Sequence, residues 1–75
     1  MGGQRYKSEF SGYTAAQIAQ MIRDANIGRE NRYIAKRVFI DHAPMVEVGE
    51  QLGYHRSTIS RRLAYITERM RNIQS

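Results

Sequence analysis

The sequence predicts an all-α fold, a compact bundle of about four helices that ends in one long helix. Two observations support this prediction. In several segments apolar residues recur at intervals of three and four, which is the period of an amphipathic helix. Residues typical of helix ends separate these segments, namely Thr14, Gly28, Pro44 and Gly53. The run at 38–40 also suits a strand, but no second segment has the alternation that a partner strand needs.

Length and composition restrict the class of protein. The 75 residues suffice for one domain near the lower size limit of independent folding, and they leave little room for a deep catalytic pocket. The absence of cysteine excludes disulfides, thiolate zinc sites and thiol catalysis. No apolar run approaches the ~20 residues of a membrane helix, and no signal-peptide core follows the start. We therefore expect a cytoplasmic binding protein that is no enzyme and holds no metal or cofactor.

Residues 1–13 are expected to form a flexible N-terminal arm, and residues 14–75 the folded domain. The arm is polar and lacks a sustained period. Two interpretations remain open for it. Either it is a frayed end with Phe10 tucked against the first helix, or it follows a DNA backbone or enters a minor groove. The residues that favour the second interpretation are Arg5, Tyr6, Lys7 and Phe10.

The first two helices are defined by a cap and by two apolar faces. Thr14 and Gln17 have the spacing of a capping box, so the first helix should begin at Ala15. We expect Gly28 to close it in the left-handed conformation. Its apolar face comprises Ile18, Met21, Ile22 and Ala25. A second helix is predicted at about 30–41, and its buried stripe comprises Ile34, Ala35, Val38 and Phe39.

The second half of the chain predicts one short helix and one long one. Pro44 fits the first turn of a helix and not its interior, so a third helix is predicted at about 45–52, ended by Gly53. The fourth helix should start near His55 or Arg56. Its apolar residues recur at spacings of four, three, four and three, which describes a seam along one face. They are Ile59, Leu63, Ile66, Met70 and Ile73.

The segment from Pro44 to Arg71 has the pattern of a helix-turn-helix. This motif joins two helices through a tight turn that often carries glycine, and Gly53 stands at that place. Gly49 supplies the small residue that is needed where the two helix backbones approach each other. In such motifs the second helix lies in the DNA major groove, where its first residues contact base edges.

The charge distribution favours an anionic partner. The chain has 12 basic and seven acidic residues, a net charge of +5. From His55 to Ser75 five arginines stand against one glutamate, so the last helix carries +4 of that charge. Arginine is suited to bidentate contacts with phosphate and guanine. Motif and charge together predict double-stranded DNA as the partner.

Four short motifs within residues 31–71 carry a family resemblance. They are Glu47-Val48-Gly49, Gln51-Leu52-Gly53, Arg56-Ser57-Thr58-Ile59 and Arg61-Arg62-Leu63. In these residues the chain resembles region four of bacterial sigma factors, the part that reads a promoter element, and small stand-alone regulators of phages and mobile elements. Pro44 and His55 depart from the pattern, because that family often has Ser or Thr at these helix caps. The resemblance implies that the groove is faced by Arg56, Ser57, Ser60 and Arg61.

Base reading is expected from these four residues. Arg56 lies on the first turn and either forks onto guanine or contacts a phosphate. Ser57 and Ser60 are short and let the helix backbone approach the bases. Arg61 points to the groove.

Three neighbouring residues complete the candidate DNA-binding set. Arg62 is expected to reach flanking phosphates. Thr58 is either a phosphate ligand or an intrahelical cap. His55 either donates to a phosphate or caps the helix.

The sequence therefore predicts a sequence-specific, double-stranded DNA-binding transcriptional regulator. The alternative is a helical adaptor that docks on RNA polymerase or on a phage packaging complex, with little affinity for DNA. The oligomeric state stays open, because Met70 and Ile73 either cover the first helix or pair with a second copy in a homodimer. A dimer would place its recognition helices about 34 Å apart, or a multiple of that.

Overall fold

A computed structural model of the chain describes residues 8–74. This part of the chain is all-α, as predicted, and its last helix is long. The elements in chain order are α1 (Ala15–Ala25), α2 (Arg29–Ala35), the π-helical segment η1 (Lys36–Ile40), α3 (Met45–Leu52) and α4 (Arg56–Gln74). Within the described range no helix is long and apolar enough to cross a membrane.

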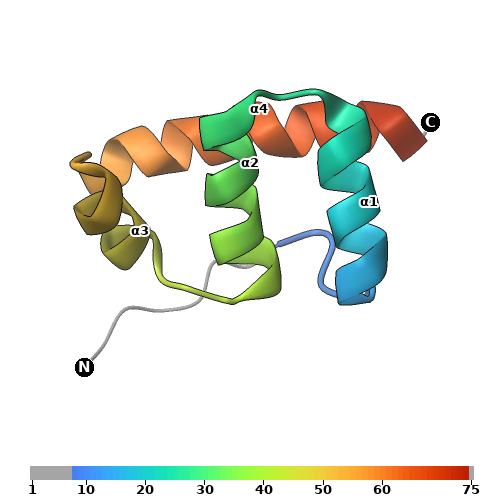
Figure 1. The fold of residues 1–75 in the computed structure, drawn as a ribbon, viewed down its shortest axis with the longest axis horizontal. Coiled ribbons are helices and arrows are strands. Elements are labelled where there is room, and N and C mark those ends of the chain that lie inside the picture. Colours follow the sequence, from blue (N-terminus) through green and yellow to red (C-terminus); the bar gives the residue numbers. More distant parts are fainter. Residues whose placement is uncertain (1–7, 75) are drawn as a thin grey trace.

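The other helices cross α4 side by side (Figure 1). α3 contacts the beginning of α4, α1 contacts its end, and α2 contacts it between them. η1 continues α2 and contacts both α1 and α3. Because α1 and α3 lie at opposite ends of α4, the two halves of this long helix have different neighbours.

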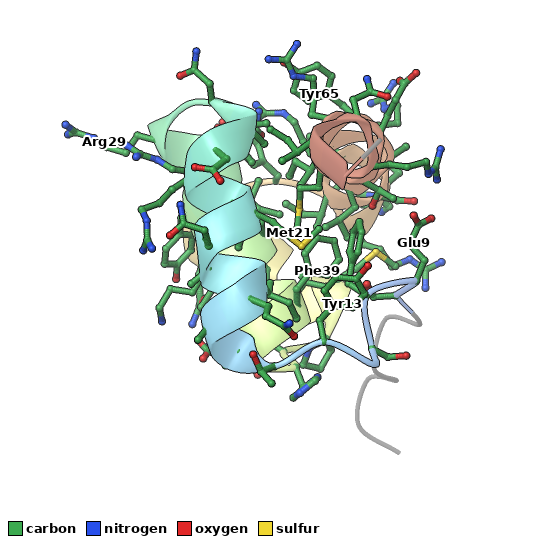
Figure 2. The ribbon with its side chains drawn as sticks, turned by 90° about the vertical axis from the view of Figure 1, so that its right-hand side faces the viewer. Glu9, Tyr13, Met21, Arg29, Phe39 and Tyr65 are labelled. Carbon is green, nitrogen blue, oxygen red and sulfur yellow. The ribbon has the colours of Figure 1, made fainter. Side chains whose placement is uncertain are left out.

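The seam of α4 forms the centre of the apolar core. Its first four members are completely buried, namely Ile59, Leu63, Ile66 and Met70. The predicted faces of α1 and of the second helical segment are also buried, and Figure 2 shows Met21 and Phe39 between α1 and α4. Ile73 departs from the seam, because it is 42% exposed. Met70 therefore belongs to the core of a single chain, whereas Ile73 stays accessible.

The capping box at the start of α1 is confirmed. The hydroxyl of Thr14 accepts from the N–H of Gln17 at 3.1 Å, and the N–H of Thr14 donates to the Gln17 amide oxygen at 2.8 Å. The predicted role of Gly28 is wrong. Asn26 closes α1 with a φ of 53°, because asparagine tolerates the left-handed region better than most residues. Gly28, with a φ of 93°, instead precedes α2 as its N-cap.

The second helix ends in a widened turn that the sequence did not predict. It was expected as one helix at 30–41, but the chain is α-helical only to Ala35 and π-helical from Lys36 to Ile40. The N–H of Asp41 donates to the carbonyl oxygen of Lys36, five residues back, at 3.0 Å. Such turns are rare in proteins and occur mostly as single bulges in α-helices.

Residues 8–13 pack against the domain through Phe10, which is 1% exposed. Its ring stands edge-on to that of Phe39, with the centroids 5.7 Å apart. Glu9 forms an ion pair with Arg71 at 2.7 Å. The arm was expected to comprise residues 1–13, and its last part, residues 8–13, is thus held against the core. The arm residues considered for DNA contact other than Phe10, namely Arg5, Tyr6 and Lys7, lie outside the described residues.

Candidate nucleic-acid interface

α3 and α4 are joined by a turn in which two glycines have separate roles. Gly53 has a φ of 80°, in the left-handed region that favours glycine. Gly49 lies where the backbones approach, since a Cβ built on it would stand 2.6 Å from the carbonyl oxygen of Tyr54. The N–H of Tyr54 donates to the carbonyl oxygen of Gly49 at 2.8 Å. α3 and α4 are thus two helices joined by a tight turn that contains a glycine, at the place where the sequence predicts a helix-turn-helix.

His55 caps the first turn of α4. Its Nδ1 accepts a hydrogen bond from the N–H of Ser57 at 3.1 Å, and its carbonyl oxygen accepts from the N–H of Thr58 at 2.9 Å. The imidazole thus does what a Ser or Thr hydroxyl does at a helix start. Of the two roles expected for His55, the structure shows the cap.

The four expected base-reading residues line one open hollow on the surface. Its volume is about 700 Å³, and its walls are Arg56, Ser57, Ser60, Arg61 and, from α3, Met45. The four residues of α4 are exposed. The spacing of three and four residues within this set places them on neighbouring turns of the helix, beside the buried seam. Met45 was predicted to face the core, and it does pack against the core while the rest of its half-buried side chain lines the hollow.

The arginines of α4 divide into two groups with different partners. Within residues 8–74 the guanidinium groups of Arg56 and Arg61 form no ion pair. Arg69 donates to the carbonyl oxygen of Ala25 at 3.1 Å, and Arg71 pairs with Glu9. Within this range Arg56 and Arg61 therefore leave two unpaired guanidinium groups beside the hollow, whereas Arg69 and Arg71 are held by contacts with residues outside α4.

Arg62 faces α2 instead of the hollow. Its guanidinium lies 3.0 Å from a carboxylate oxygen of Glu30 and 2.9 Å from the amide oxygen of Asn31. It also stacks over the ring of Tyr54 at 5.4 Å, and the Tyr54 hydroxyl donates to Glu30 at 3.0 Å. Thr58 is half-buried and also lies outside the hollow lining. Of the seven expected DNA-binding residues, the structure thus brings four together and gives Arg62 a role between helices.

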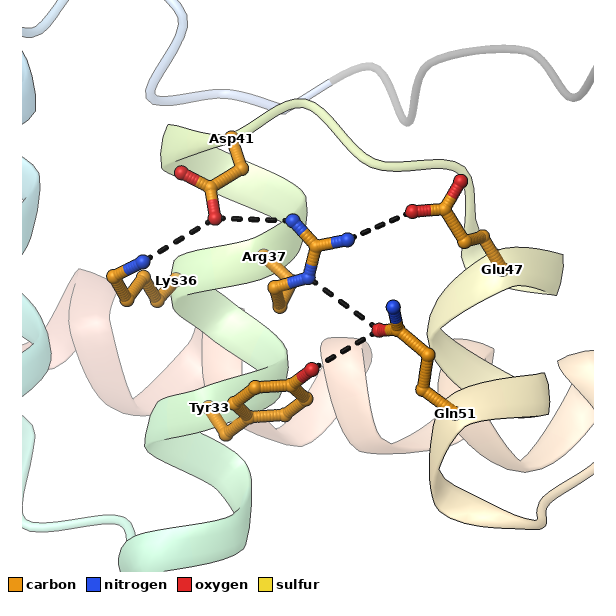
Figure 3. A network of polar contacts seen from close by, with 6 residues as sticks. All are labelled: Tyr33, Lys36, Arg37, Asp41, Glu47 and Gln51. Carbon is orange, nitrogen blue, oxygen red and sulfur yellow. Dashed lines mark hydrogen bonds and ion pairs between the residues drawn. The ribbon is translucent and has the colours of Figure 1, made fainter.

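A polar network holds α3 against η1, and Figure 3 shows its six residues. Arg37 is at the centre, with its guanidinium 3.1 Å from Asp41 and 2.7 Å from Glu47. Gln51 accepts from the hydroxyl of Tyr33 at 3.0 Å and from Nε of Arg37 at 3.5 Å. The sequence contains one signal of this network, the spacing of four between Arg37 and Asp41. Its bonds to α3 bring together residues that are ten or more positions apart, so no local pattern predicts them.

The network also changes two pKa values. Hydrogen bonds from Arg37 and, to a lesser extent, from Lys36 lower the pKa of Asp41 below its ordinary 3.8. The same contact with Asp41 raises the pKa of Arg37. Arg37 also pairs with Glu47, so the same guanidinium joins η1 to α3, the helix that contributes Met45 to the hollow.

Comparisons with models of protein families, with curated proteins and with solved structures found no match. Among the described side chains, no group of three or more His, Cys, Asp or Glu residues is placed to hold a metal ion. The geometry itself offers an exposed hollow with two arginines, two serine hydroxyls and one thioether. These are groups that donate hydrogen bonds and contact apolar edges.

Proposed function

We propose that this chain binds double-stranded DNA sequence-specifically through the first turns of α4 and thereby regulates transcription. The observation that carries this proposal is the hollow lined by Arg56, Ser57, Ser60 and Arg61. Two of these residues are arginines that form no ion pair within residues 8–74, and they stand on the second helix of the predicted helix-turn-helix. The four residues of α4 in this hollow are the ones that the sequence-based hypothesis assigns to base reading.

Capture and reading are separate steps in this proposal. Exposed arginines attract the phosphate backbone without regard to sequence. Arg56 or Arg61 then forks onto O6 and N7 of a guanine, the commonest specific contact in the major groove. Ser57 and Ser60 add short donors and keep the helix close to the base edges. The α3–η1 network supports these steps by holding α3 at one angle to α4.

The class of regulator is proposed from the resemblance of the four quoted motifs to sigma region four. RNA polymerase then becomes a second partner of the chain. A homodimer is compatible with an exposed Ile73, and it would read a two-fold symmetric site.

The proposal is tested by selecting bound sequences from a random duplex pool with the full chain. We expect one enriched motif that contains at least one G·C pair. Affinity for this motif should fall steeply with rising salt, because several phosphates are neutralised. Arg56→Ala should weaken binding to the motif by about 1–3 kcal/mol and relax specificity at one base pair. Arg29, which points away from the domain (Figure 2), provides the matched control Arg29→Ala.

One outcome would contradict the proposal, and a second would change the role of Arg56. An absence of enrichment, together with binding that salt does not change, would favour the helical adaptor. An equal loss on the selected and on random duplexes would make Arg56 a phosphate contact, and base reading would then rest on the other three residues. The symmetry of the selected motif would also show whether one or two copies bind.

A further inference from the structure

A second hollow lies between α1 and the α2–η1 segment, away from the candidate DNA surface. Its volume is about 280 Å³. The apolar part of its lining comes from Ala19, Ile22 and Ile40, and the polar part from Arg23, Arg32 and Lys36. None of these residues lines the hollow at the start of α4. Figure 1 shows that α1 lies at the end of the molecule opposite to α3.

The π-helical segment η1 contributes one basic and one apolar residue to the lining of this hollow. Lys36 begins η1 and Ile40 ends it. Ile40 is half-buried, so part of its side chain packs on the core and part faces the groove. Turns of this kind are frequently found at functional sites. An intact α-helix would place residue 40 at a different angle around the axis, so the widened turn is what sets Ile40 beside Ile22.

The rim of this groove carries three basic side chains, two of which form no ion pair within residues 8–74. In the part of the chain that the structure describes, Arg32 forms no ion pair. Arg23 donates to the neutral amide of Gln20 at 2.7 Å. Lys36 lies 3.3 Å from Asp41, but its side chain remains 61% exposed. Three cations thus surround an apolar floor of a size that suits one large side chain.

We propose that this groove binds an acidic segment of a protein partner. The segment inserts one aliphatic or aromatic side chain between Ile22 and Ile40, and it places carboxylates against Arg32 and its two basic neighbours. Apolar floor and basic rim together select this occupant by charge and by shape. A DNA backbone would match the charge alone, because it has no side chain to fill the floor. This surface does not depend on the proposed DNA binding, and the two together would bring an acidic partner to a DNA site.

The test uses the isotope-labelled full chain and synthetic peptides, followed by NMR chemical shifts. The probe is a short helical peptide with one central leucine flanked by glutamates. One control peptide has lysines in place of the glutamates, and the other has alanine in place of the leucine. We expect the acidic probe to shift the amide signals of Ile22, Arg32 and Ile40, and to bind at least about tenfold more tightly than either control.

Two variants separate the groove from general charge attraction. Arg32→Glu should weaken the acidic probe about tenfold, whereas Arg29→Glu changes the net charge equally outside the groove and should have little effect. Ala19→Leu fills the floor without changing charge and should also block the probe. Thermal unfolding of each variant confirms that it is folded.

Three results would overturn the inference. One is a set of shifts that spares the groove residues, and another is an equal loss from Arg32→Glu and Arg29→Glu. The third is a loss of duplex DNA affinity in Arg32→Glu as large as in Arg61→Glu, which would assign this face to DNA. Failure of the DNA selection leaves the peptide result untouched, so the two proposals fail separately.

Discussion

Gly49 and Tyr54 are in contact through their backbones, with the Tyr54 N–H donating to the Gly49 carbonyl oxygen at 2.8 Å. A Cβ on Gly49 would stand 2.6 Å from the Tyr54 carbonyl oxygen and 3.5 Å from Ile59. The first distance is too short for real atoms and involves a backbone that cannot rotate away. The close approach of α3 to the turn before α4 is therefore possible because residue 49 is a glycine.

Gly49→Ala should destabilise the domain by about 1–3 kcal/mol, because the added methyl group forces α3 away from the turn. Urea unfolding at neutral pH measures this change. Gly12→Ala is the control, since a Cβ there meets no atom within 4 Å. Equal stability of the two variants would show that the turn relaxes at little cost and that the close approach does not set the helix angle.

His55→Ala should lower stability by about 0.5–2 kcal/mol, the usual cost of removing a helix N-cap. His55→Asn should restore most of this loss, because an asparagine side chain caps helices well. The unfolding free energies of the three proteins measure the effect. A restored stability with unchanged DNA affinity supports the cap as the role of His55. If the asparagine variant folds well but binds DNA more weakly, the imidazole has a role at a phosphate too.

Arg61 and Arg62 are neighbours in sequence, yet we expect replacement of the first to weaken DNA binding and replacement of the second to weaken the fold. Arg61→Ala should cost about 1–3 kcal/mol of binding to the selected duplex and leave the unfolding free energy nearly unchanged. Arg62→Ala should destabilise the fold by about 1 kcal/mol, a modest value because the Arg62 side chain is 34% exposed. Arg62→Ala should weaken binding to the selected duplex less than Arg61→Ala does. The reverse pattern would contradict the assignment of Arg62 to the α2–α4 contact.

Acid should weaken the fold partly through Asp41. Its pKa in the folded chain lies below the ordinary 3.8, so the unfolded chain takes up the proton more readily. The stability that this carboxylate contributes is therefore complete above its ordinary pKa and is lost as the pH falls through the lower, folded value. Asp41→Asn should reduce stability at neutral pH and make it less dependent on acid. Unfolding at neutral and at acidic pH tests this, with Glu50→Gln on the exposed side of α3 as the control.

Local signals predicted most of the secondary structure. The capping box of Thr14 and Gln17, the turn at Gly53 and the seam of α4 each depend on residues a few positions apart. Such patterns act through the geometry of one helix, so they can be recognised without knowledge of the rest of the fold. The same patterns failed at Gly28, because Asn26 is an alternative left-handed cap two positions earlier.

Other features depend on where distant segments come together. Phe10 is polar-flanked in the sequence, yet it is in the core because Phe39 lies beside it. The network between Arg37 and Gln51 joins η1 to α3. The groove beside Ile40 requires both the widened turn and the position of α1. None of these features is predicted by the periodicity of the sequence.

The sequence by itself determined that the domain is helical, where its helices begin and end within a few residues, and which face of the last helix is buried. Only the tertiary structure decided which of its basic side chains stay available. Arg61 and Arg62 are chemically identical and adjacent, but α2 brings Glu30 and Asn31 to one of them. The physical reason is that a helix turns about 100° per residue, so neighbours on it meet different surroundings. Arg62 meets a partner some thirty positions away in the chain and helps to hold the fold. Arg61 has no such partner within residues 8–74, and we propose that it reads DNA.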